Sequence, residues 1–357
     1  MNIQSLTLVV TEDCNFDCTY CYKQRHHDRM TSATVRKALS FFLPFLTDPF
    51  YLNFYGGEPL LCFDLIEQTI SFLDEKNKEY GKSPQYSLTT NGSLITEEIL
   101  QILDTYKFSV VFSFDGYAQE IHRQNGSYDL AVSNIKKISE FPNIQLEVNS
   151  VFTPETVGHI SDSMEFMMNL GVKNINLSFS FLRPWNTQSV ERLGEEMAKL
   201  RKILVSQYVK SKEIPVMSFR KDETEGFFYC AGGQDRMSVT SEEHVWGCDL
   251  FADCFRGKEK SPEYRDYFFG DLDTFANNHK KVYPKISSNY AKLSMDNFAT
   301  PRMNCLFCSN LEDCIVCPAA AAFSGVPIGE IPSFVCEIQK IKIAERQKFR
   351  EEILAIS

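Results

Sequence analysis

Apolar residues in roughly the first 210 positions follow two alternating periods, one near two residues and one of three to four. The first period predicts strands and the second predicts amphipathic helices. We expect strands at residues 6–10, 51–55, 86–90, 108–114, 144–151 and 175–182. We expect a helix after each strand, with apolar sets that begin at Val35, Leu65, Ile99, Leu130, Ile160 and Val190. Six consecutive strand–helix units predict an α/β fold with parallel strands, as an open sheet or a partial (β/α)6 barrel.

This rhythm stops near Ile214. The sequence beyond it is loop-rich and contains eight of the twelve cysteines of the chain. Such a region builds little core by hydrophobic burial alone, so we expect metal ligation to supply part of its folding energy. We place a domain boundary near residues 212–225, and helical spacing returns over residues 337–356.

Composition and charge exclude several classes of protein. The 357 residues include 47 acidic and 37 basic side chains, a net charge of −10 with no basic block, which argues against nucleic acid or an anionic membrane as the main partner. No apolar stretch approaches the roughly 18 residues of a membrane span, and no basic leader precedes the first strand, so we expect a cytoplasmic protein. Because thiols stay reduced there, twelve cysteines predict metal or iron–sulfur ligation rather than disulfides.

The first cysteine motif is CxxxCxxC, formed by Cys14, Cys18 and Cys21 directly after the first strand. Its loop belongs to the carboxyl edge of the strands, where α/β proteins place ligands. Three thiolates on a cubane iron–sulfur cluster leave one iron open to a substrate or cofactor. The alternative is a zinc site completed by His26 or His27.

The second strand ends in the sequence GGEP at residues 56–59, whose glycines allow the backbone to approach a ligand closely. Together with the cysteine motif and the six strand–helix units, it resembles the radical SAM superfamily. The resemblance implies a [4Fe-4S] cluster on the three cysteines, with an open iron that chelates S-adenosylmethionine (SAM). It implies that the backbone of Gly56, Gly57 and Glu58 meets the methionine amino group of SAM. It also implies SAM contacts from Tyr20, Asn91, Ser113, Asp115, Arg123 and Leu182.

Several of these contacts have ordinary structural alternatives. Tyr20 could be a core residue, Asn91 a turn residue and Asp115 a helix cap. The reaction implied by the resemblance is a one-electron reduction of the SAM sulfonium. It releases methionine and a 5′-deoxyadenosyl radical, which the protein orients against one C–H bond of a substrate.

The second cysteine motif is the run CLFCSNLEDCIVC at residues 305–317, which has a CxxC pair at each end. Four such thiols could close a zinc ribbon without help. With the cysteines that flank it at 230, 248 and 336, however, the run resembles the SPASM extension of radical SAM enzymes. Two features depart from that pattern: the last interval of the run is one residue short, and Glu243 replaces the usual glycine.

The SPASM resemblance implies two auxiliary [4Fe-4S] clusters. One would be enclosed by Cys305, Cys308, Cys314 and Cys336. The other would be bound by Cys230, Cys248 and Cys317, with either Cys254 as a fourth ligand or an open iron that binds substrate. Cys62 is left over, and we expect it to be a small buried hydrophobe.

Asp249 follows Cys248 in the sequence CDLF. In the sulfatase-maturating relatives, the aspartate at this place is the proposed general base, so the resemblance makes Asp249 the candidate catalytic residue. The alternative is a loop carboxylate that accepts hydrogen bonds from backbone N–H groups.

The sequence therefore predicts a radical SAM partial barrel at residues 1–215, a loop-rich SPASM region at 216–340 and a C-terminal helix at 341–357. The expected function is an oxidoreductase that modifies a peptide or protein by crosslinking or side-chain oxidation, as RiPP-type peptide maturases do. Alternatives are a sulfatase-maturating enzyme that forms formylglycine, an enzyme acting on a small molecule or tetrapyrrole, and a non-enzymatic zinc or electron-carrier protein. The expected partners are a flavodoxin- or ferredoxin-type electron donor and the substrate, presented by a separate leader-binding protein or bound directly in the barrel mouth.

Overall fold

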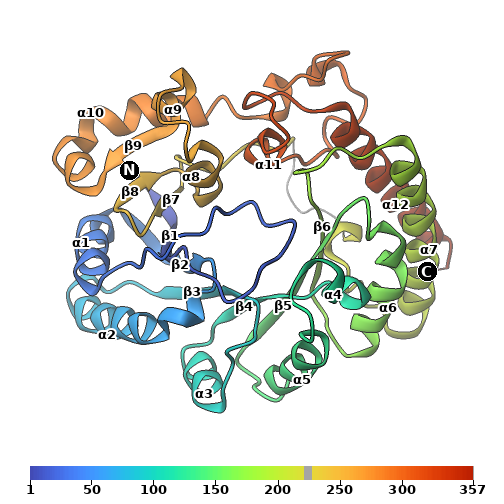
Figure 1. Cartoon of the computed structure of the whole chain (residues 1–357), viewed down its shortest axis with the longest axis horizontal. Helices are drawn as coiled ribbons and strands as arrows, with labels where there is room; N and C mark the ends of the chain where they lie inside the picture. The colour runs from blue at the N-terminus through green and yellow to red at the C-terminus, as the bar shows by residue number, and fades with distance from the viewer. Residues whose placement is uncertain (221–226, 357) are drawn as a thin grey trace.

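A single nine-stranded sheet organises the computed structural model, which describes residues 1–220 and 227–356 (Figure 1). The strand order is β6-β5-β4-β3-β2-β1-β7-β8-β9. The first six strands are parallel, β7 pairs in parallel with the free edge of β1, and β8 and β9 are antiparallel. The parallel sheet of a partial barrel is therefore confirmed, with three further strands at one edge.

The six strand–helix units lie where the apolar pattern predicts them. The strands are β1 (Ile3–Thr11), β2 (Leu46–Gly56), β3 (Pro84–Thr90), β4 (Ser109–Ser113), β5 (Gln145–Phe152) and β6 (Ile175–Phe179). The helices are α1 (Ser32–Phe42), α2 (Phe63–Tyr80), α3 (Glu97–Thr105), α4 (Gln119–His122), α5 (Tyr128–Ile138), α6 (Ile160–Asn169) and α7 (Thr187–Ser211). In Figure 1 the helices cover the outside of the curved sheet, while the loop between β1 and α1 lies inside the ring.

Local signals explain where these helices begin and which face they bury. Thr31 precedes α1 and Asn186 precedes α7, and the side chain of each accepts a hydrogen bond from a backbone N–H of the first turn. Such caps satisfy donors that have no partner inside the helix. In α3, Ile99, Leu100 and Leu103 form the buried face. In these helices the capping residue and the apolar face indicate the same helix, and the sequence pattern therefore predicted it.

The C-terminal part of the chain contains more regular structure than its sequence pattern predicts. Its elements are β7 (Arg236–Val239), β8 (His244–Trp246), α8 (Asp249–Phe255), α9 (Pro262–Tyr267), β9 (Phe268–Asp271), α10 (Leu272–Tyr290), α11 (Pro318–Ala322) and α12 (Ser333–Ile356). The expectation of little core in this region is wrong. The fully buried Tyr290 ring lies 4.8 Å from the Phe251 ring and 5.9 Å from the Phe269 ring, centroid to centroid. Aromatic rings at irregular spacing build this core, and a periodicity does not reveal them.

The C-terminal helix α12 returns to the barrel and packs along α7. Arg201 Nε on α7 donates to Glu345 Oε2 on α12 at 2.7 Å, and the rings of Tyr208 and Phe349 lie 6.4 Å apart. The helix begins at Ser333, earlier than its sequence pattern indicates. The division of the chain at residues 215 and 340 stays a prediction, and residues 221–226 of the expected boundary lie outside the described residues.

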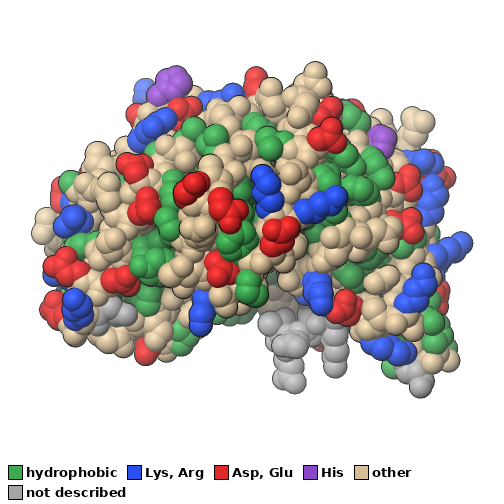
Figure 2. Space-filling model, turned by 90° about the horizontal axis from the view of Figure 1, so that it is seen from below, with side chains coloured by type: hydrophobic (Ala, Val, Ile, Leu, Met, Phe, Trp, Pro, Cys, Tyr) green, Lys and Arg blue, Asp and Glu red, His purple; other side chains and the backbone are tan. Residues whose placement is uncertain are grey.

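The described helices and the face drawn in Figure 2 have the following charge and apolar character. Among the described helices, none combines the length and apolar character needed to cross a bilayer. On the face drawn in Figure 2, acidic and basic side chains are interspersed. That face therefore shows no broad basic surface of the kind that nucleic acid binds.

Candidate active site and cysteine clusters

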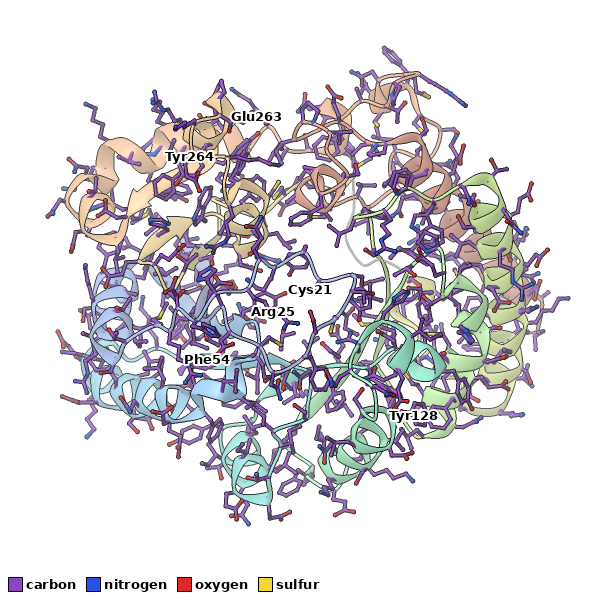
Figure 3. All side chains as sticks on the ribbon, viewed as in Figure 1. Cys21, Arg25, Phe54, Tyr128, Glu263 and Tyr264 are labelled. Carbon is purple, nitrogen blue, oxygen red and sulfur yellow. The ribbon has the colours of Figure 1, made fainter. Side chains whose placement is uncertain are left out.

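A cavity of about 490 Å³ lies at the carboxyl ends of the parallel strands. Ten of the residues predicted for the first cluster and for SAM line it: Cys14, Cys18, Tyr20, Cys21, Gly56, Gly57, Asn91, Ser113, Arg123 and Leu182. Figure 3 shows Cys21 and Arg25 inside the ring of secondary structure. The folding of six strand–helix units thus gathers residues from positions 14 to 182 around one space.

The glycines at the end of β2 hold the cysteine loop against the sheet. A β-carbon at Gly57 would lie 2.1 Å from the carbonyl oxygen of Asp13, and one at Gly56 would lie 2.0 Å from that of Thr11. Across this contact, the N–H of Gly57 donates to the Thr11 carbonyl and the N–H of Glu58 donates to the Asp13 carbonyl, both at 2.9 Å. These glycines are therefore required for backbone approach next to Cys14, and they also line the cavity.

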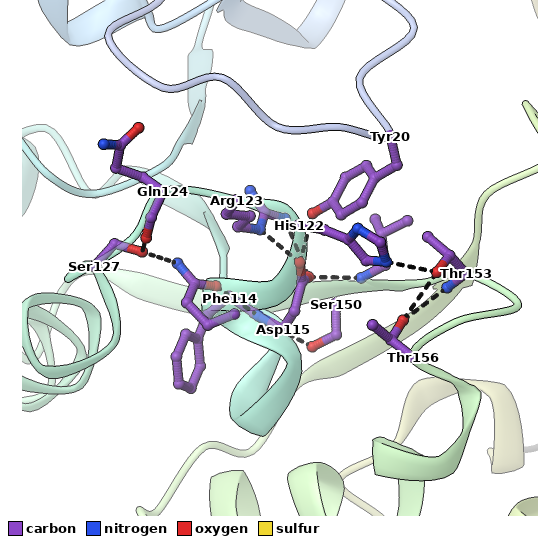
Figure 4. A network of polar contacts seen from close by, with 12 residues as sticks. Tyr20, Phe114, Asp115, His122, Arg123, Gln124, Ser127, Ser150, Thr153 and Thr156 are labelled. Carbon is purple, nitrogen blue, oxygen red and sulfur yellow. Dashed lines mark hydrogen bonds and ion pairs between the residues drawn. The ribbon is translucent and has the colours of Figure 1, made fainter.

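Figure 4 shows Asp115 bound to Tyr20 and Arg123, two residues that line the cavity. Its carboxylate accepts hydrogen bonds from the Tyr20 hydroxyl at 2.6 Å, from Arg123 Nε at 2.8 Å and from the N–H of Val151 at 2.8 Å. Asp115 is fully buried and does not line the cavity, whereas Tyr20 and Arg123 do. Burial opposes the charged guanidinium, but the Asp115 carboxylate beside it raises the pKa of Arg123. In the structure Asp115 thus supports two residues of the cavity lining, and its own contact with SAM stays a prediction.

Glu58 also lies outside the cavity, although it belongs to the GGEP motif. Its buried carboxylate accepts hydrogen bonds from the N–H groups of Leu60 and Asn91 and from the Thr90 hydroxyl, at 2.7 to 3.0 Å. Burial raises the pKa of Glu58 to about 7, and these hydrogen bonds oppose the rise. The side chain therefore joins the end of β2 to the end of β3 at the backbone of Asn91, a residue that lines the cavity.

The cysteine loop itself offers thiols in partly buried surroundings. Burial raises the pKa of Cys14 and raises that of Cys18 to about 11, so both sulfurs are protonated at neutral pH unless a metal binds them. Asn91 Nδ2 lies 3.9 Å from Cys14 Sγ and 2.9 Å from Asn15 Oδ1. The donor set of three thiols beside a polar amide fits an iron–sulfur group with one open position.

The spacing of the sulfurs argues against a single zinc ion. Zinc holds tetrahedral thiolates at about 2.3 Å, which brings sulfurs within about 4 Å of one another. Over residues 1–220 and 227–356, the only group of three His, Cys, Asp or Glu donors within 4.8 Å is His26, Asp28 and Glu242. His26 Nδ1 lies 2.7 Å from Asp28 Oδ2, and His27 Nδ1 lies 3.4 Å from Asp13 Oδ2. Both histidines therefore face carboxylates, and neither completes a compact zinc site with the cysteines.

Four cysteines of the C-terminal region surround a second, small cavity. They are the four that the SPASM resemblance groups together: Cys305, Cys308, Cys314 and Cys336. The other lining side chains are apolar apart from Thr300. Burial raises the pKa of Cys314 to about 12, and the neighbouring thiols add to the rise. This arrangement of thiols in an apolar shell fits a closed iron–sulfur group.

A third group of thiols lies around Cys317. The thiols of Cys230, Cys248 and Cys254 are all close enough to interact electrostatically with it. Cys248 directly precedes α8 and Cys317 directly precedes α11, so two helix N-termini lie at this group. Cys254 is buried on α8, in keeping with its candidacy as fourth ligand. Cys62 is buried in a short turn before α2, as expected for a small hydrophobe.

The family comparison agrees with this geometry. Residues 8–167 match the model of the radical SAM superfamily. The chain carries a radical SAM domain. The resemblance predicted from CxxxCxxC and GGEP is thereby confirmed, and the matched segment contains the three cysteines, both glycines and the carboxyl ends of β1 to β5.

Curated relatives share this domain over about half of the chain. The uncharacterized protein MJ0907 of Methanocaldococcus jannaschii is 31% identical over 189 residues, which make up 51% of this chain and 64% of that protein. The radical SAM cyclopropyl synthase TigE of Paramaledivibacter caminithermalis is 29% identical over 213 residues, 53% of this chain and 44% of that protein. The chain thus spans less than two thirds of the length of both relatives.

Solved structures share the fold beyond the radical SAM domain. Native anSMEcpe with bound AdoMet and the Cp18Cys peptide has a TM-score of 0.78 at 16% identity, over 99% of this chain and 99% of that one. Streptococcus suis SuiB bound to the precursor peptide SuiA has a TM-score of 0.59 at 15% identity, over 94% of this chain and 76% of that one. The fold therefore extends through the cysteine-rich C-terminal part.

Asp249 lies at the start of α8, beside the radical SAM domain's cavity but not in its lining. The next residue, Leu250, does line the cavity. Burial raises the pKa of Asp249, and the nearby Lys23 ammonium opposes the rise. The Cys248 thiol lies 3.6 Å from Asp249 Oδ1. The structure thus brings this carboxylate close to the third thiol group, as the CDLF sequence implies.

Two features beside the radical SAM cavity were not predicted from the sequence. One is a polar row on β5 and β6, in which Asn149 accepts hydrogen bonds from Asn176 at 3.0 Å and Ser178 at 3.2 Å. All three residues line the cavity, and their alternation with apolar neighbours was a signal that could have revealed them. The other is Tyr22 and Lys23, directly after Cys21, which no motif or period distinguishes.

Proposed function

We propose that this chain cleaves SAM reductively in the 490 Å³ cavity and uses the product to remove a hydrogen from a bound substrate. The observation that supports this function is the convergence of Cys14, Cys18 and Cys21 with the two glycines of GGEP on one cavity at the strand ends. When bound there, a [4Fe-4S] cluster supplies the electron that breaks a carbon–sulfur bond of SAM.

The residues of the chain have separate tasks in this proposal. The three cysteines hold the cluster, and the backbone of Gly56 and Gly57 receives the methionine amino group. Tyr20, Asn91, Ser113, Arg123 and Leu182 contact SAM, while Asp115 and Glu58 fix the side chains and strand ends that make those contacts. Apolar side chains that also line the cavity, among them Phe179, Phe181 and Phe323, exclude water from the reacting atoms.

The remaining thiol groups are proposed to hold two auxiliary [4Fe-4S] clusters. The closed one uses Cys305, Cys308, Cys314 and Cys336, and the other uses Cys230, Cys248 and Cys317 with Cys254. After anaerobic reconstitution we expect about twelve irons with matching sulfide, and about eight in a chain with Cys14, Cys18 and Cys21 changed to alanine. Stoichiometric zinc without sulfide would contradict this assignment and favour the zinc or electron-carrier alternative.

The proposed substrate is a peptide or protein. The support is that anSMEcpe and SuiB, which share this fold, have been solved with bound peptides. Either crosslinking or side-chain oxidation fits, including the formylglycine reaction suggested by Asp249 after Cys248. An external flavodoxin- or ferredoxin-type donor would supply electrons, and a leader-binding protein would present the peptide if the cavity alone does not select it.

Mass spectrometry of short peptides coexpressed with the enzyme tests the substrate class. A peptide substrate predicts a mass loss of about two hydrogens for a crosslink, or a formylglycine-specific change at one Cys or Ser. Modification of a small molecule or tetrapyrrole, with every peptide unchanged, would contradict the peptide proposal while leaving SAM cleavage intact.

A further inference from the structure

Lys23 forms a buried ion pair that joins two distant parts of the chain. Its Nζ lies 2.8 Å from Glu12 Oε2 and 2.9 Å from Asp253 Oδ2. The Lys23 side chain is 5% exposed, and both carboxylates are 1% exposed. Arg256 Nη2 adds a further contact to Glu12 at 3.3 Å. Glu12 follows β1 and Asp253 belongs to α8, so the ammonium bridges the cysteine loop and the C-terminal region.

The helix held by this ion pair carries much of the chemistry proposed for the C-terminal region. Cys248 directly precedes α8, Asp249 is its first residue and Cys254 lies one residue after Asp253. The neighbouring residue Tyr22 makes a second link. Its ring stacks on Phe323, next to α11, at 4.9 Å between centroids and 27° between planes. Two consecutive residues after Cys21 therefore contact α8 and the segment after α11.

Ordinary stability does not explain a charge cluster at this place. Removing a lysine and two carboxylates from water is costly, and apolar side chains of similar size often stabilise a protein as well or better. A buried cluster of one lysine and two carboxylates instead requires precise geometry, because any shift leaves a charge unpaired. Such a contact can fix the position of α8 relative to the segment that follows β1.

We propose that Lys23 is a positioning residue that fixes α8, and with it Cys248, Asp249 and Cys254, relative to the loop of Cys14, Cys18 and Cys21. This inference rests on the proposed function only for the roles of those cysteines and of Asp249. The ion pair itself ties the end of β1 to α8 whether or not the chain cleaves SAM.

The chain offers a matched control in Lys37. Its Nζ also bridges two carboxylates of the C-terminal region, Glu243 at 2.7 Å and Asp273 at 2.6 Å. The Lys37 side chain is 32% exposed, and it does not line the cavity. Substitution of Lys37 removes a more exposed ion pair between the N-terminal and C-terminal parts of the chain, and its partners Glu243 and Asp273 lie outside α8.

Hydrogen–deuterium exchange of the reconstituted full chain tests the proposal. In Lys23→Met, amides of α8 at residues 249–255 are expected to exchange about tenfold faster than in the wild type. Lys23→Arg should restore most of the protection, and Lys37→Met should leave α8 unchanged. Unchanged α8 exchange in Lys23→Met, or equal acceleration in Lys37→Met, would overturn the proposal.

A spectroscopic readout separates positioning from general stability. With Cys14, Cys18 and Cys21 changed to alanine, the remaining clusters should give an electron paramagnetic resonance spectrum that Lys23→Met alters and Lys37→Met does not. If Lys23→Met does not fold, the variant Glu12→Gln, Lys23→Met, Asp253→Asn removes the unpaired charges, and the same two results are expected from it. Failure of the proposed function would be distinguishable from failure of this inference. The wild type would then bind no iron or cleave no SAM, while hydrogen exchange of α8 would still depend on Lys23.

Discussion

Asp115 is a residue whose contacts could not be predicted from the sequence. Its motif predicts a place near SAM, and its carboxylate accepts hydrogen bonds from the Tyr20 hydroxyl and the Arg123 guanidinium, two residues that line the cavity. The partner Tyr20 lies 95 positions earlier in the chain. A hydrogen bond between residues so far apart in the sequence depends on the completed fold. The place of Asp115 in its motif was therefore predictable, but its hydrogen-bond partners were not.

Glu58 makes stability depend on pH. Because its folded pKa is about 7 and its ordinary value is 4.5, the folded chain keeps this proton where the unfolded chain has released it. The contribution of Glu58 to stability therefore falls as pH rises from about 5 to 7 and is constant above. We expect the free energy of unfolding of the wild type, relative to Glu58→Gln, to fall by about 3 kcal/mol between pH 5 and 8. Denaturant unfolding at both pH values measures it, and an equal difference at both would show that Glu58 is not titrating there.

Asp249 is the single carboxylate that is proposed to take a proton from the substrate as it is oxidised. Asp249→Asn keeps the shape of the side chain and removes the base. We expect product formation to slow by a factor of about 100 or more while 5′-deoxyadenosine still accumulates. Quantifying both compounds in one reaction provides the control. Product formed at the wild-type rate would exclude Asp249 as the base.

At the scale of elements, helices and strands with a regular apolar period could be predicted from the sequence, and elements without such a period could not. The six strands and one helix after each carry alternating or helical apolar patterns, and these were predicted, whereas the four-residue α4 was not. β7 to β9 have only three or four residues each, and the aromatic core around Tyr290 has no period. Glu243, the residue that departs from the SPASM glycine, has a φ of 62°, the left-handed conformation that glycine adopts freely. Its carboxylate binds Lys37, which helps to offset the strain.

The contact between the GGEP turn and the cysteine loop gives a sharp test at this scale. Gly57→Ala places a β-carbon 2.1 Å from the Asp13 carbonyl, so the loop must move. We expect destabilisation of about 1 to 3 kcal/mol and loss of about four irons per chain. Gly194→Ala on α7 is the control, since no atom lies within 4 Å of its new β-carbon. There, alanine should stabilise the helix by about 0.5 to 1 kcal/mol, and iron content should not change. Full iron retention in Gly57→Ala would show that this contact is not needed to hold the first cluster.

At the scale of the whole molecule, the sheet explains why the cysteine-rich region contributes to the lining of the cavity. β7 pairs with β1, which is the strand that leads into the first cysteine motif. This pairing brings Leu250, Ala320 and Phe323 into the lining of a cavity built mainly by the radical SAM domain. The grouping of the cysteines was predictable from family resemblance. Their place over the barrel mouth was not, because it depends on a strand pairing that local sequence does not encode.

The central claim is that the cavity containing Cys14, Cys18 and Cys21 cleaves SAM. The most direct test is 5′-deoxyadenosine formation by the anaerobically reconstituted protein with SAM and a strong reductant. The wild type should form it, Cys18→Ala should reduce it at least about a thousandfold, and Cys314→Ala in the closed C-terminal group should retain it. No 5′-deoxyadenosine from a wild type with full iron content, or undiminished formation by Cys18→Ala, would contradict the account.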